Sequence, residues 1–298
     1  MEVPVIRLGP VSVYLGEKSG KYPDGNQVVV RGADSLAAFD TPLVANRLGD
    51  EFLATDLVVL GHVHEDHMAG LHRVPHAPVY VHEADAEAAR SWHGLARHYG
   101  YRPAVLEGMH AKVEREFHYV PRPDALAYAD GARWDLGGGV TVQAIHAPGH
   151  TSGHCVLFVE PGGIAFIGDI DLSSFGPYYG DATSSLAAFR RTLARVKDIP
   201  AKAWITSHHK GVITNREQFQ QLLTAFAARL DAREEAIAGF LHARPATLEQ
   251  LIAHRFVYPQ GLNELFFEDV ERRTIAQHLD SLAQSGRARR DGDTWRAV

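Results

Sequence analysis

The chain has 298 residues, of which 45% are hydrophobic and 22% charged, and its net charge is −6 with histidine counted as neutral. These ordinary values exclude a disordered chain, and the negative charge argues against a dedicated binder of nucleic acid or of anionic membranes. The single cysteine, Cys155, excludes an internal disulfide and favours a reducing, cytoplasmic location, and neither a signal peptide nor an apolar run of 18 residues is recognised.

Strands dominate the elements predicted for the first sixty residues. Runs of β-branched and apolar residues bounded by glycine and proline predict strands within residues 5–16, 26–32 and 35–42. A buried strand over residues 57–60 opens into a loop rich in histidine, after which residues 66–73 predict a short helix. The first histidine-rich loop therefore follows a buried strand directly.

The middle of the chain repeats this pattern. Residues 78–92 predict a strand followed by a helix, whereas residues 92–125 are irregular, with helical parts and several aromatic side chains that could contact a substrate. Residues 133–171 predict two strands, a second histidine-rich loop and two further strands. A helix over 185–196 then precedes a strand within 203–211 that ends in a third histidine-rich loop.

The C-terminal part follows a different pattern. A long helical region from residue 215 is predicted to break near Asp231, and Thr247 and Gln250 have the spacing of a capping box at the start of the next helix. Another helix follows, and then a hairpin with Asp291 and Gly292 at its turn.

These patterns divide the chain into two domains. Residues 1–228 form a mixed α/β domain, and residues 229–298 resemble a winged-helix domain in the order of their elements. The smaller domain has ten Lys and Arg against eleven Asp and Glu, so it lacks the basic excess of a nucleic-acid binder. Covering the mouth of an active site, or forming a homodimer interface, is the other role considered for it.

The stretch GHVHEDHM places His62, His64, Asp66 and His67 within six positions. Imidazole nitrogen and carboxylate oxygen are the ligands that zinc and similar ions prefer. Two ligands at i and i+2 of one loop can face one ion, while Asp66 and His67 can face a second ion a few ångströms away. The alternative, a run of solvated or structural histidines, is weakened because more candidate ligands follow other strands.

Those further candidates come later in the chain, each after an apolar strand, and are His150, Asp169 and His208. Together with Asp40, which closes a strand, and the histidine-rich motif, they stand in the order found in the metallo-β-lactamase-fold superfamily, which this chain resembles. The resemblance covers residues 1–228 and implies an αββα sandwich with a metal site at one edge.

The resemblance also implies which residues hold metal. The first ion would be held by His62, His64 and His150. The second would be held by Asp66, His67 and His208, with Asp169 bridging the two and Asp40 supporting the site through hydrogen bonds. His209 competes with His208, but the last ligand of the family usually follows a small residue, here Ser207, so we assign His209 to the surroundings of the site.

Two adjacent ions lower the pKa of a bridging water and so supply hydroxide near neutral pH. The sequence therefore predicts a hydrolase with two divalent ions, zinc before iron or manganese, that acts on a small acyl ester, thioester or lactone. A phosphodiesterase or ribonuclease is the first alternative, and a non-catalytic metal-binding regulatory protein is the second. The predicted partner is a small-molecule substrate, without membrane association; nucleic acid is not favoured, and a homodimer stays open.

Differences between this sequence and particular branches of the superfamily limit the activities that it is predicted to have. The presence of Asp169 and the lack of a recognised signal peptide argue against the true β-lactamases. Only 38 residues separate Asp169 from His208, which leaves no room for the inserted cap of the nucleases. The stretch SHHKGVIT also departs from the last motif of the glutathione-thioester hydrolases.

In addition to Asp66, which is predicted to be both a metal ligand and a catalytic residue, Tyr178 and Tyr179 are candidate catalytic residues. They lie in SSFGPYYGD, which follows Asp169 closely, and either hydroxyl could donate a hydrogen bond to a substrate oxyanion. The alternative is that both rings pack this loop against the domain or against a second copy of the chain.

Overall fold

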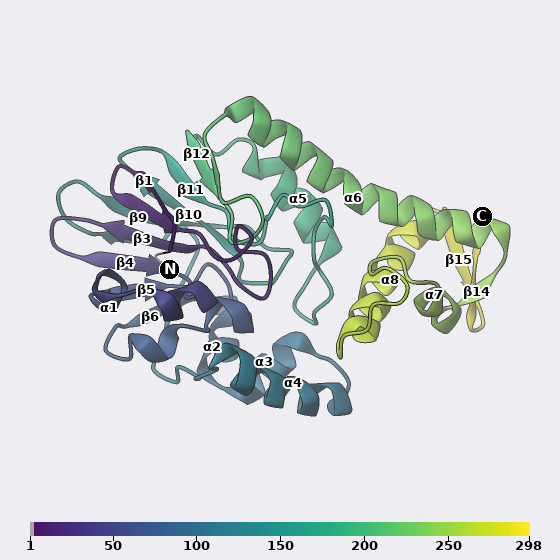
Figure 1. Cartoon of the computed structure of the whole chain (residues 1–298). Helices are drawn as coiled ribbons and strands as arrows, with labels where there is room; N and C mark the ends of the chain where they lie inside the picture. Colours follow the sequence, from purple (N-terminus) through teal and green to yellow (C-terminus); the bar gives the residue numbers. More distant parts are fainter. Residues whose placement is uncertain (1–2) are drawn as a thin grey trace.

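The computed structural model describes residues 3–298, and it shows two stacked sheets with helices on both outer sides and a smaller unit at the far end of a long helix (Figure 1). The first sheet has seven strands in the order β1-β2-β3-β4-β5-β6-β7. Its strands are β1 (Val5–Leu8), β2 (Val11–Tyr14), β3 (Gln27–Arg31), β4 (Leu36–Phe39), β5 (Leu57–Val59), β6 (Val79–His82) and β7 (Leu126–Tyr128). Strands β1 to β4 pair antiparallel, and β4 to β7 pair parallel.

The second sheet has six strands in the order β13-β12-β11-β10-β9-β8. Its strands are β8 (Arg133–Asp135), β9 (Thr141–His146), β10 (Cys155–Glu160), β11 (Ile164–Phe166), β12 (Ala203–Ile205) and β13 (Val212–Ile213). Neighbouring strands are antiparallel except for the parallel pair β11 and β12.

Strand β10 shows why the sheets stack. Cys155, Leu157 and Val159 alternate with Val156 and Phe158, and successive side chains of a strand point to opposite faces. The first three pack into the core between the two sheets, whereas the other two pack into the core beneath the helices of the second sheet. Because both faces are apolar, each sheet needs cover on its outer side.

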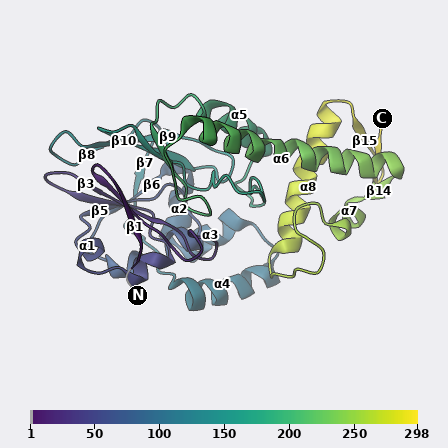
Figure 2. The same ribbon diagram turned by 45° about the horizontal axis from the view of Figure 1, so that its top comes forward.

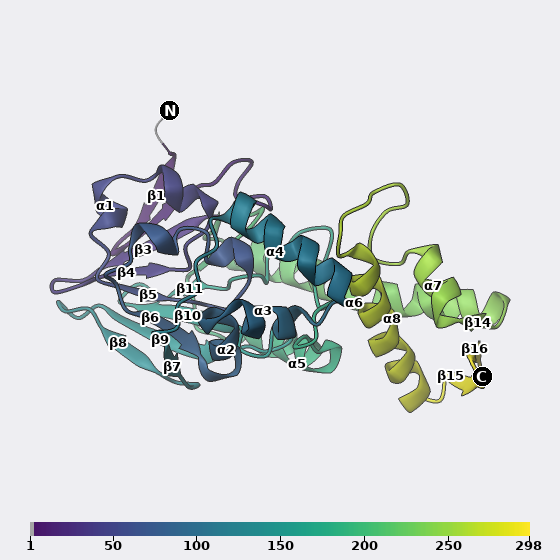
Figure 3. The same cartoon turned by 90° about the horizontal axis from the view of Figure 1, so that it is seen from below.

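Helices supply that cover and complete an αββα sandwich, as the sequence predicted. The first sheet is covered by α1 (Asp50–Leu53), α2 (Ala86–Arg90), α3 (Trp92–Tyr99) and α4 (Pro103–Phe117), and the second by α5 (Leu186–Val196) and α6 (Arg216–Ala243). Figure 3 shows α2, α3 and α4 together on one side. Short 3-10 turns lie between these elements, and they are η1 (Leu43–Arg47), η2 (Glu65–His67), η3 (Leu71–Arg73) and η4 (Glu83–Asp85).

Two local predictions were wrong, and one was incomplete. The short helix expected over 66–73 is instead the two 3-10 turns η2 and η3, which orient side chains in a tighter bend. The helical parts expected within 92–125 are the regular helices α3 and α4, so this stretch is more regular than predicted. Helix α6 does not break near Asp231, because that side chain lies on the exposed face, where a single aspartate is tolerated.

Helix α6 continues from the sandwich into the C-terminal unit (Figure 2). Its buried positions Phe219, Leu223 and Phe226 pack against the second sheet, and about three turns further along Ile237 and Leu241 pack into a separate core. One helix thereby belongs to both cores, and it crosses the predicted boundary at 228 without interruption.

The C-terminal unit contains the predicted helices and hairpin in the predicted order, together with a short strand, β14, that was not predicted. Its elements are β14 (Ala246–Thr247), α7 (Leu248–His254), α8 (Phe267–Gln284), β15 (Ala288–Asp291) and β16 (Thr294–Ala297), with the strands in the order β14-β16-β15. The capping box of Thr247 and Gln250 is present, and the hairpin turns at Gly292 and Asp293, one residue later than expected. Assigning this unit to the winged-helix class stays a prediction. Among the helices of residues 3–298, none combines the length and apolar composition needed to cross a bilayer.

The core between the sheets gives a first prediction. Phe166 is 1% exposed, and its ring centroid lies 5.9 Å from that of Phe39 on the opposite sheet. We expect Phe166→Ala to lower the free energy of unfolding by about 3–5 kcal/mol, because it removes a large buried ring and leaves a cavity. Urea denaturation checks this, with Val120→Ala as the control, since Val120 is 41% exposed and should change stability by less than about 0.5 kcal/mol. Equal effects of the two substitutions would contradict the assignment of the core.

Candidate metal centre

The predicted ligands lie where several strands end. His62 and His64 follow β5, His150 follows β9, Asp169 follows β11 and His208 follows β12. Strands β4 and β5 are parallel to each other, as are β11 and β12, so their carboxyl ends meet at one edge of the sandwich. The topology therefore brings together residues that lie up to 146 positions apart, from 62 to 208.

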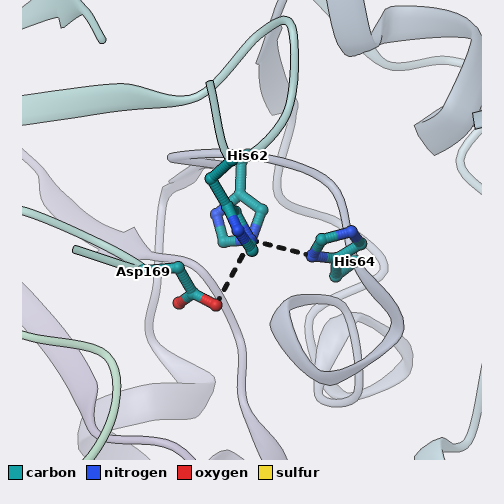
Figure 4. A group of neighbouring side chains, drawn as sticks. His62, His64 and Asp169 are labelled. Carbon is teal, nitrogen blue, oxygen red and sulfur yellow. Dashed lines mark hydrogen bonds and ion pairs between the residues drawn. The ribbon is translucent and has the colours of Figure 1, made fainter. Parts of the chain in front are cut away.

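A first group consists of His62, His64, His150 and Asp169, whose ligand atoms lie within 4.8 Å of one another. His150 Nε2 lies 3.2 Å from His62 Nε2 and 3.1 Å from His64 Nδ1. Asp169 Oδ2 lies 3.3 Å from His150 Nε2. Figure 4 shows His62, His64 and Asp169 directed toward a common point.

A second group consists of Asp66, His67 and His208, again within 4.8 Å. Asp66 Oδ2 lies 3.1 Å from His208 Nε2 and 3.7 Å from His67 Nε2. The other oxygen of Asp169, Oδ1, lies 3.2 Å from His67 Nε2 and 3.5 Å from His208 Nε2. One carboxylate thus faces both groups, with a different oxygen toward each.

These separations fit bound metal ions. Nitrogen and oxygen ligands at about 2.0–2.1 Å from a tetrahedral ion lie about 3.3 Å from one another, which is close to the separations within both groups. His67 Nε2 and Asp169 Oδ1 are buried and have no hydrogen-bond partner of good geometry among residues 3–298. Buried polar atoms without partners are costly, and a cation between these two would satisfy both.

Partners outside the two groups orient the ligands. Asp40 Oδ2 lies 2.8 Å from His67 Nδ1, and the Gly61 amide donates to Asp40 Oδ1 at 2.7 Å. His208 Nδ1 donates to the Gly20 carbonyl at 2.7 Å, and His150 Nδ1 to the Tyr178 carbonyl at 3.0 Å. Such bonds fix the ring nitrogen that faces the metal.

One further partner was not singled out from the sequence. Asp181 Oδ2 lies 2.6 Å from His64 Nε2, on the side of the ring opposite the first group. The carboxylate of Asp85 is a second omission, since it accepts hydrogen bonds from the Thr151 hydroxyl at 2.7 Å and the Gly153 amide at 2.7 Å, within the loop that carries His150. Neither aspartate has a local sequence signal, because each contacts a segment far away in the chain.

Burial and charge set the protonation of the ligands in opposite directions. Burial, with nearby imidazoles, lowers the pKa of His150 to about 4 and that of His62 well below its usual value, so both rings are neutral and ready to bind. Burial also opposes charge on His64 and His208, but Asp181 outweighs it for His64, and Asp169 and Asp66 outweigh it for His208. The pKa of His64 rises to about 9 and that of His208 to about 10.

The two candidate tyrosines have different surroundings. The Tyr179 hydroxyl lies 2.8 Å from His278 Nε2, in the contact with the C-terminal unit, so it does not face the metal groups. Tyr178 lies beside the first group, with its ring centroid 5.6 Å from that of His150, and its hydroxyl donates to Asp181 at 3.0 Å. Both hydroxyls therefore have partners within the chain, and a role toward a substrate oxyanion stays a prediction.

His208 and His209 differ in burial and in the residues they contact. His208 is buried in the second group, whereas His209 has a left-handed backbone (φ 62°) and its Nε2 lies 3.6 Å from Asp171 Oδ2. The turn rotates His209 away, so His208 is the one of the two that meets Asp66 and His67.

The sequence profile of the Metallo-beta-lactamase superfamily matches residues 42–219. The chain is 26% identical over 205 residues to the atrochrysone carboxyl ACP thioesterase dmxR1 of Cryptosporiopsis sp. (strain 8999), covering 66% of this chain and 61% of that protein. It is 25% identical over 191 residues to an atrochrysone carboxyl ACP thioesterase of Pseudocercospora fijiensis (strain CIRAD86), covering 64% and 54%. The chain therefore spans less than two thirds of the length of these curated relatives.

Solved structures share the fold over almost the whole chain. The metallo-beta-lactamase family protein TTHA1429 of Thermus thermophilus is similar with a TM-score of 0.71 and 24% identity, covering 98% of this chain and 99% of that one. A beta-lactamase domain protein of Burkholderia ambifaria is similar with a TM-score of 0.68 and 16% identity, covering 99% and 94%. The likeness includes the C-terminal unit as well as the sandwich.

Metal uptake should depend on pH. His64 and His208 carry protons below pKa values of about 9 and 10 in the metal-free protein, and a metal ligand must release its proton. Affinity should therefore rise from pH 6.5 to 8.5, by about tenfold per pH unit for each proton displaced. Competition with a chromophoric chelator, and calorimetry in two buffers with different ionisation enthalpies, measure this. Affinity that is independent of pH would contradict the arrangement.

Proposed function

The chain belongs to the metallo-β-lactamase superfamily and is a hydrolase, and from that premise we propose that it is a dinuclear metal-dependent hydrolase of a small acyl ester, thioester or lactone. The observation that carries the proposal is the position of Asp169. Its Oδ2 lies 3.3 Å from His150 Nε2 in the first group, and its Oδ1 lies 3.2 Å from His67 Nε2 in the second. A carboxylate shared in this way suits two adjacent ions rather than one.

The proposed ligand set leaves much of the metal charge uncompensated. Two carboxylates, Asp66 and Asp169, and five imidazoles would face two divalent ions, with zinc the first choice and iron or manganese also compatible. The ions, when bound, supply a Lewis acid and lower the pKa of water between them toward neutrality. Because most ligands are neutral, the site keeps a positive field, which favours negative charge that develops on a substrate oxygen.

The side chains of this site restrict what can reach it. Every ligand side chain of the two groups is at most 9% exposed except Asp169, whose side chain is 15% exposed. Asp169 is therefore the ligand side chain that solvent reaches most easily. Burial of the other ligands favours a small reacting group at the end of a substrate over a rigid duplex.

A thioester is the first substrate to test within this class. The two curated relatives are named as thioesterases, and their matches cover 66% and 64% of this chain. A carbonyl carbon bonded to sulfur suits a site that presents a nucleophile and a positive field together. The acyl group and the carrier are left to the experiment, because the chain spans only part of each relative.

The nucleic-acid alternative gains no support from the C-terminal unit. Arg272 pairs with Glu249 within that unit, and Arg287 pairs with Glu235. Arg273 donates to the Gly100 carbonyl of the sandwich at 2.9 Å. These three arginines of the C-terminal unit have partners inside the molecule, and the unit carries no basic excess.

The test compares hydrolysis of thioesters, lactones, p-nitrophenyl esters and bis(p-nitrophenyl) phosphate by the purified chain. We expect acyl substrates to be preferred and about two ions to be bound per chain. Asp169→Asn should lower kcat/KM by about three orders of magnitude or more, because both ions lose a ligand. Asp171→Asn is the matched control, since that carboxylate lies in the same loop but outside both groups.

Three results would count against the proposal. Preference for the phosphodiester would favour the phosphodiesterase or ribonuclease alternative. Two bound ions without turnover of any substrate in the panel would favour a regulatory metal-binding protein. Binding of fewer than two ions per chain would exclude the dinuclear site itself.

A further inference from the structure

Two segments of the sandwich and one helix of the C-terminal unit converge behind the first metal group. Asp181 lies at their meeting point and is fully buried, with 0% exposure. Its Oδ2 lies 2.6 Å from His64 Nε2, while His64 Nδ1 faces His150 Nε2 at 3.1 Å. His64 therefore stands between a buried carboxylate and the first group.

We propose that Asp181 is the positioning residue of the first metal site, and that helix α8 of the C-terminal unit holds Asp181 in place. The inference rests on the proposed dinuclear site, because a positioning residue needs an ion to position a ligand for. It assigns the C-terminal unit a task in building the site, in addition to any part it plays in covering it.

The bond from His64 to Asp181 decides which ring nitrogen faces the metal. When Nε2 carries the proton and donates it to the carboxylate, Nδ1 must present its lone pair to the first group. The negative charge of Asp181 also makes that lone pair a stronger ligand. The distance of 2.6 Å is shorter than the separation of about 3.3 Å expected for two ligands of one ion, so the pair is a hydrogen bond.

This distance also decides against a third metal site. His64, His98 and Asp181 could in principle surround an ion, since their ligand atoms lie within 4.8 Å of one another. An ion there would have to replace the His64 to Asp181 bond. It would also leave the tyrosine hydroxyls that donate to Asp181 facing a cation.

Two tyrosine hydroxyls fix the second oxygen of Asp181. Tyr101 donates to Oδ1 at 2.6 Å and Tyr178 donates to the same atom at 3.0 Å. The Ser184 hydroxyl accepts from the Asp181 amide at 3.1 Å. A buried carboxylate with donors on both oxygens is compensated for its loss of water and cannot rotate freely.

Helix α8 holds the segments that carry these groups. Arg273 Nη2 donates to the Gly100 carbonyl at 2.9 Å, next to Tyr101, and Gln277 Nε2 donates to the Tyr179 carbonyl at 3.0 Å, next to Tyr178. Gly180 packs so closely on Val270 that a Cβ atom at this position would collide with that side chain. Figure 3 shows α8 beside α3 and α4, where the first of these segments lies.

Additional contacts tie the two segments to each other and to the C-terminal unit. The Ala182 amide donates to the Tyr99 carbonyl at 3.0 Å. The Tyr101 ring stacks on that of Phe266, with centroids 6.1 Å apart and planes 11° apart. Asp269 Oδ1 accepts from Arg102 Nε at 3.1 Å. The position of Asp181 is therefore set by contacts on both sides of the interface.

The second metal group has an aspartate, Asp40, that corresponds to Asp181 of the first group and provides an internal control. Asp40 Oδ2 lies 2.8 Å from His67 Nδ1, and Asp40 follows strand β4 of the sandwich. Its other oxygen accepts from the Gly61 amide, also in the sandwich. Asp40 therefore needs nothing from α8, whereas Asp181 depends on it.

The experiment compares Asp181→Asn with Asp40→Asn in the full chain. The readouts are the affinities for two Zn²⁺ ions, measured against a chelator, and the ratio of zinc to protein after dialysis. Asp181→Asn should lower the affinity for one ion by about 10- to 100-fold and leave the affinity for the other unchanged within about twofold. Asp40→Asn should weaken the other ion, and unfolding of the metal-free variants checks that both remain folded.

Double variants show which ion each aspartate serves. Combining Asp181→Asn with His150→Ala should lower the number of bound ions by no more than one, because both changes act on the first site. Combining Asp181→Asn with His208→Ala should weaken the binding of both ions, because the changes act on different sites. If Asp181→Asn does not fold, Tyr101→Phe together with Tyr178→Phe tests the same prediction by removing both donors to Oδ1.

The role of α8 is tested within the helix itself. Arg273→Ala combined with Gln277→Ala should weaken the same ion as Asp181→Asn, by about tenfold. Arg272→Ala is the matched control, since Arg272 is in the same helix but pairs with Glu249 of the C-terminal unit. It should leave both affinities unchanged.

The outcomes separate this inference from the proposed function. If the unmodified chain binds fewer than two ions, the dinuclear proposal fails first. If it binds two, and Asp181→Asn weakens both ions equally or neither, Asp181 is not a positioning residue of the first site. A ratio of three ions per chain that falls to two in Asp181→Asn would make Asp181 a metal ligand instead, and would also overturn the inference.

Discussion

The structure around the site depends on one electrostatic constraint. Two carboxylates and five imidazoles are buried together at one edge of the sandwich, most of them less than 9% exposed. Burying so many polar groups is unfavourable unless every atom finds a partner or a cation, since water is not there to solvate them. The ligands therefore need fixed orientations, and Asp40, the Gly20 carbonyl and Asp181 each bond the far side of one ring. The loops around the site therefore have to place Asp40, the Gly20 carbonyl and Asp181 within hydrogen-bond distance of these rings.

Much of this was predictable because it is local in sequence. Residues 62–67 carry four candidate ligands on one loop, and the end of a buried strand is readable from its apolar run. The outcome for His208 over His209 also followed from the strand end. The sandwich was expected from the resemblance to the superfamily. A strand such as β10 agrees with it, because both of its faces are apolar and each needs a covering layer.

What could not be read from the sequence is non-local. His64 and Asp181 are 117 positions apart, and no spacing rule connects them. Tyr179 was a plausible oxyanion donor by its distance along the chain from Asp169, but helix α8 turns its hydroxyl toward His278. The predicted break near Asp231 failed likewise, because the cores on both sides of that residue share the same helical face. In each case tertiary packing decided the outcome that local propensity left open.

The two aspartates behind the metal groups differ in what they require of the rest of the chain. Asp40 is bonded by a strand end and a loop of the sandwich, so the second site is complete once the two sheets have formed. Asp181 lies on a loop whose backbone accepts a hydrogen bond from Gln277 of helix α8. Helix α8 lies outside residues 42–219, which match the superfamily. We therefore expect changes in the C-terminal unit to alter the proposed first site while the proposed second site stays the same. A superfamily member with a different C-terminal unit would need another way to hold the equivalent of His64, and that requirement links the sequence of this unit to the chemistry at the sheet edge.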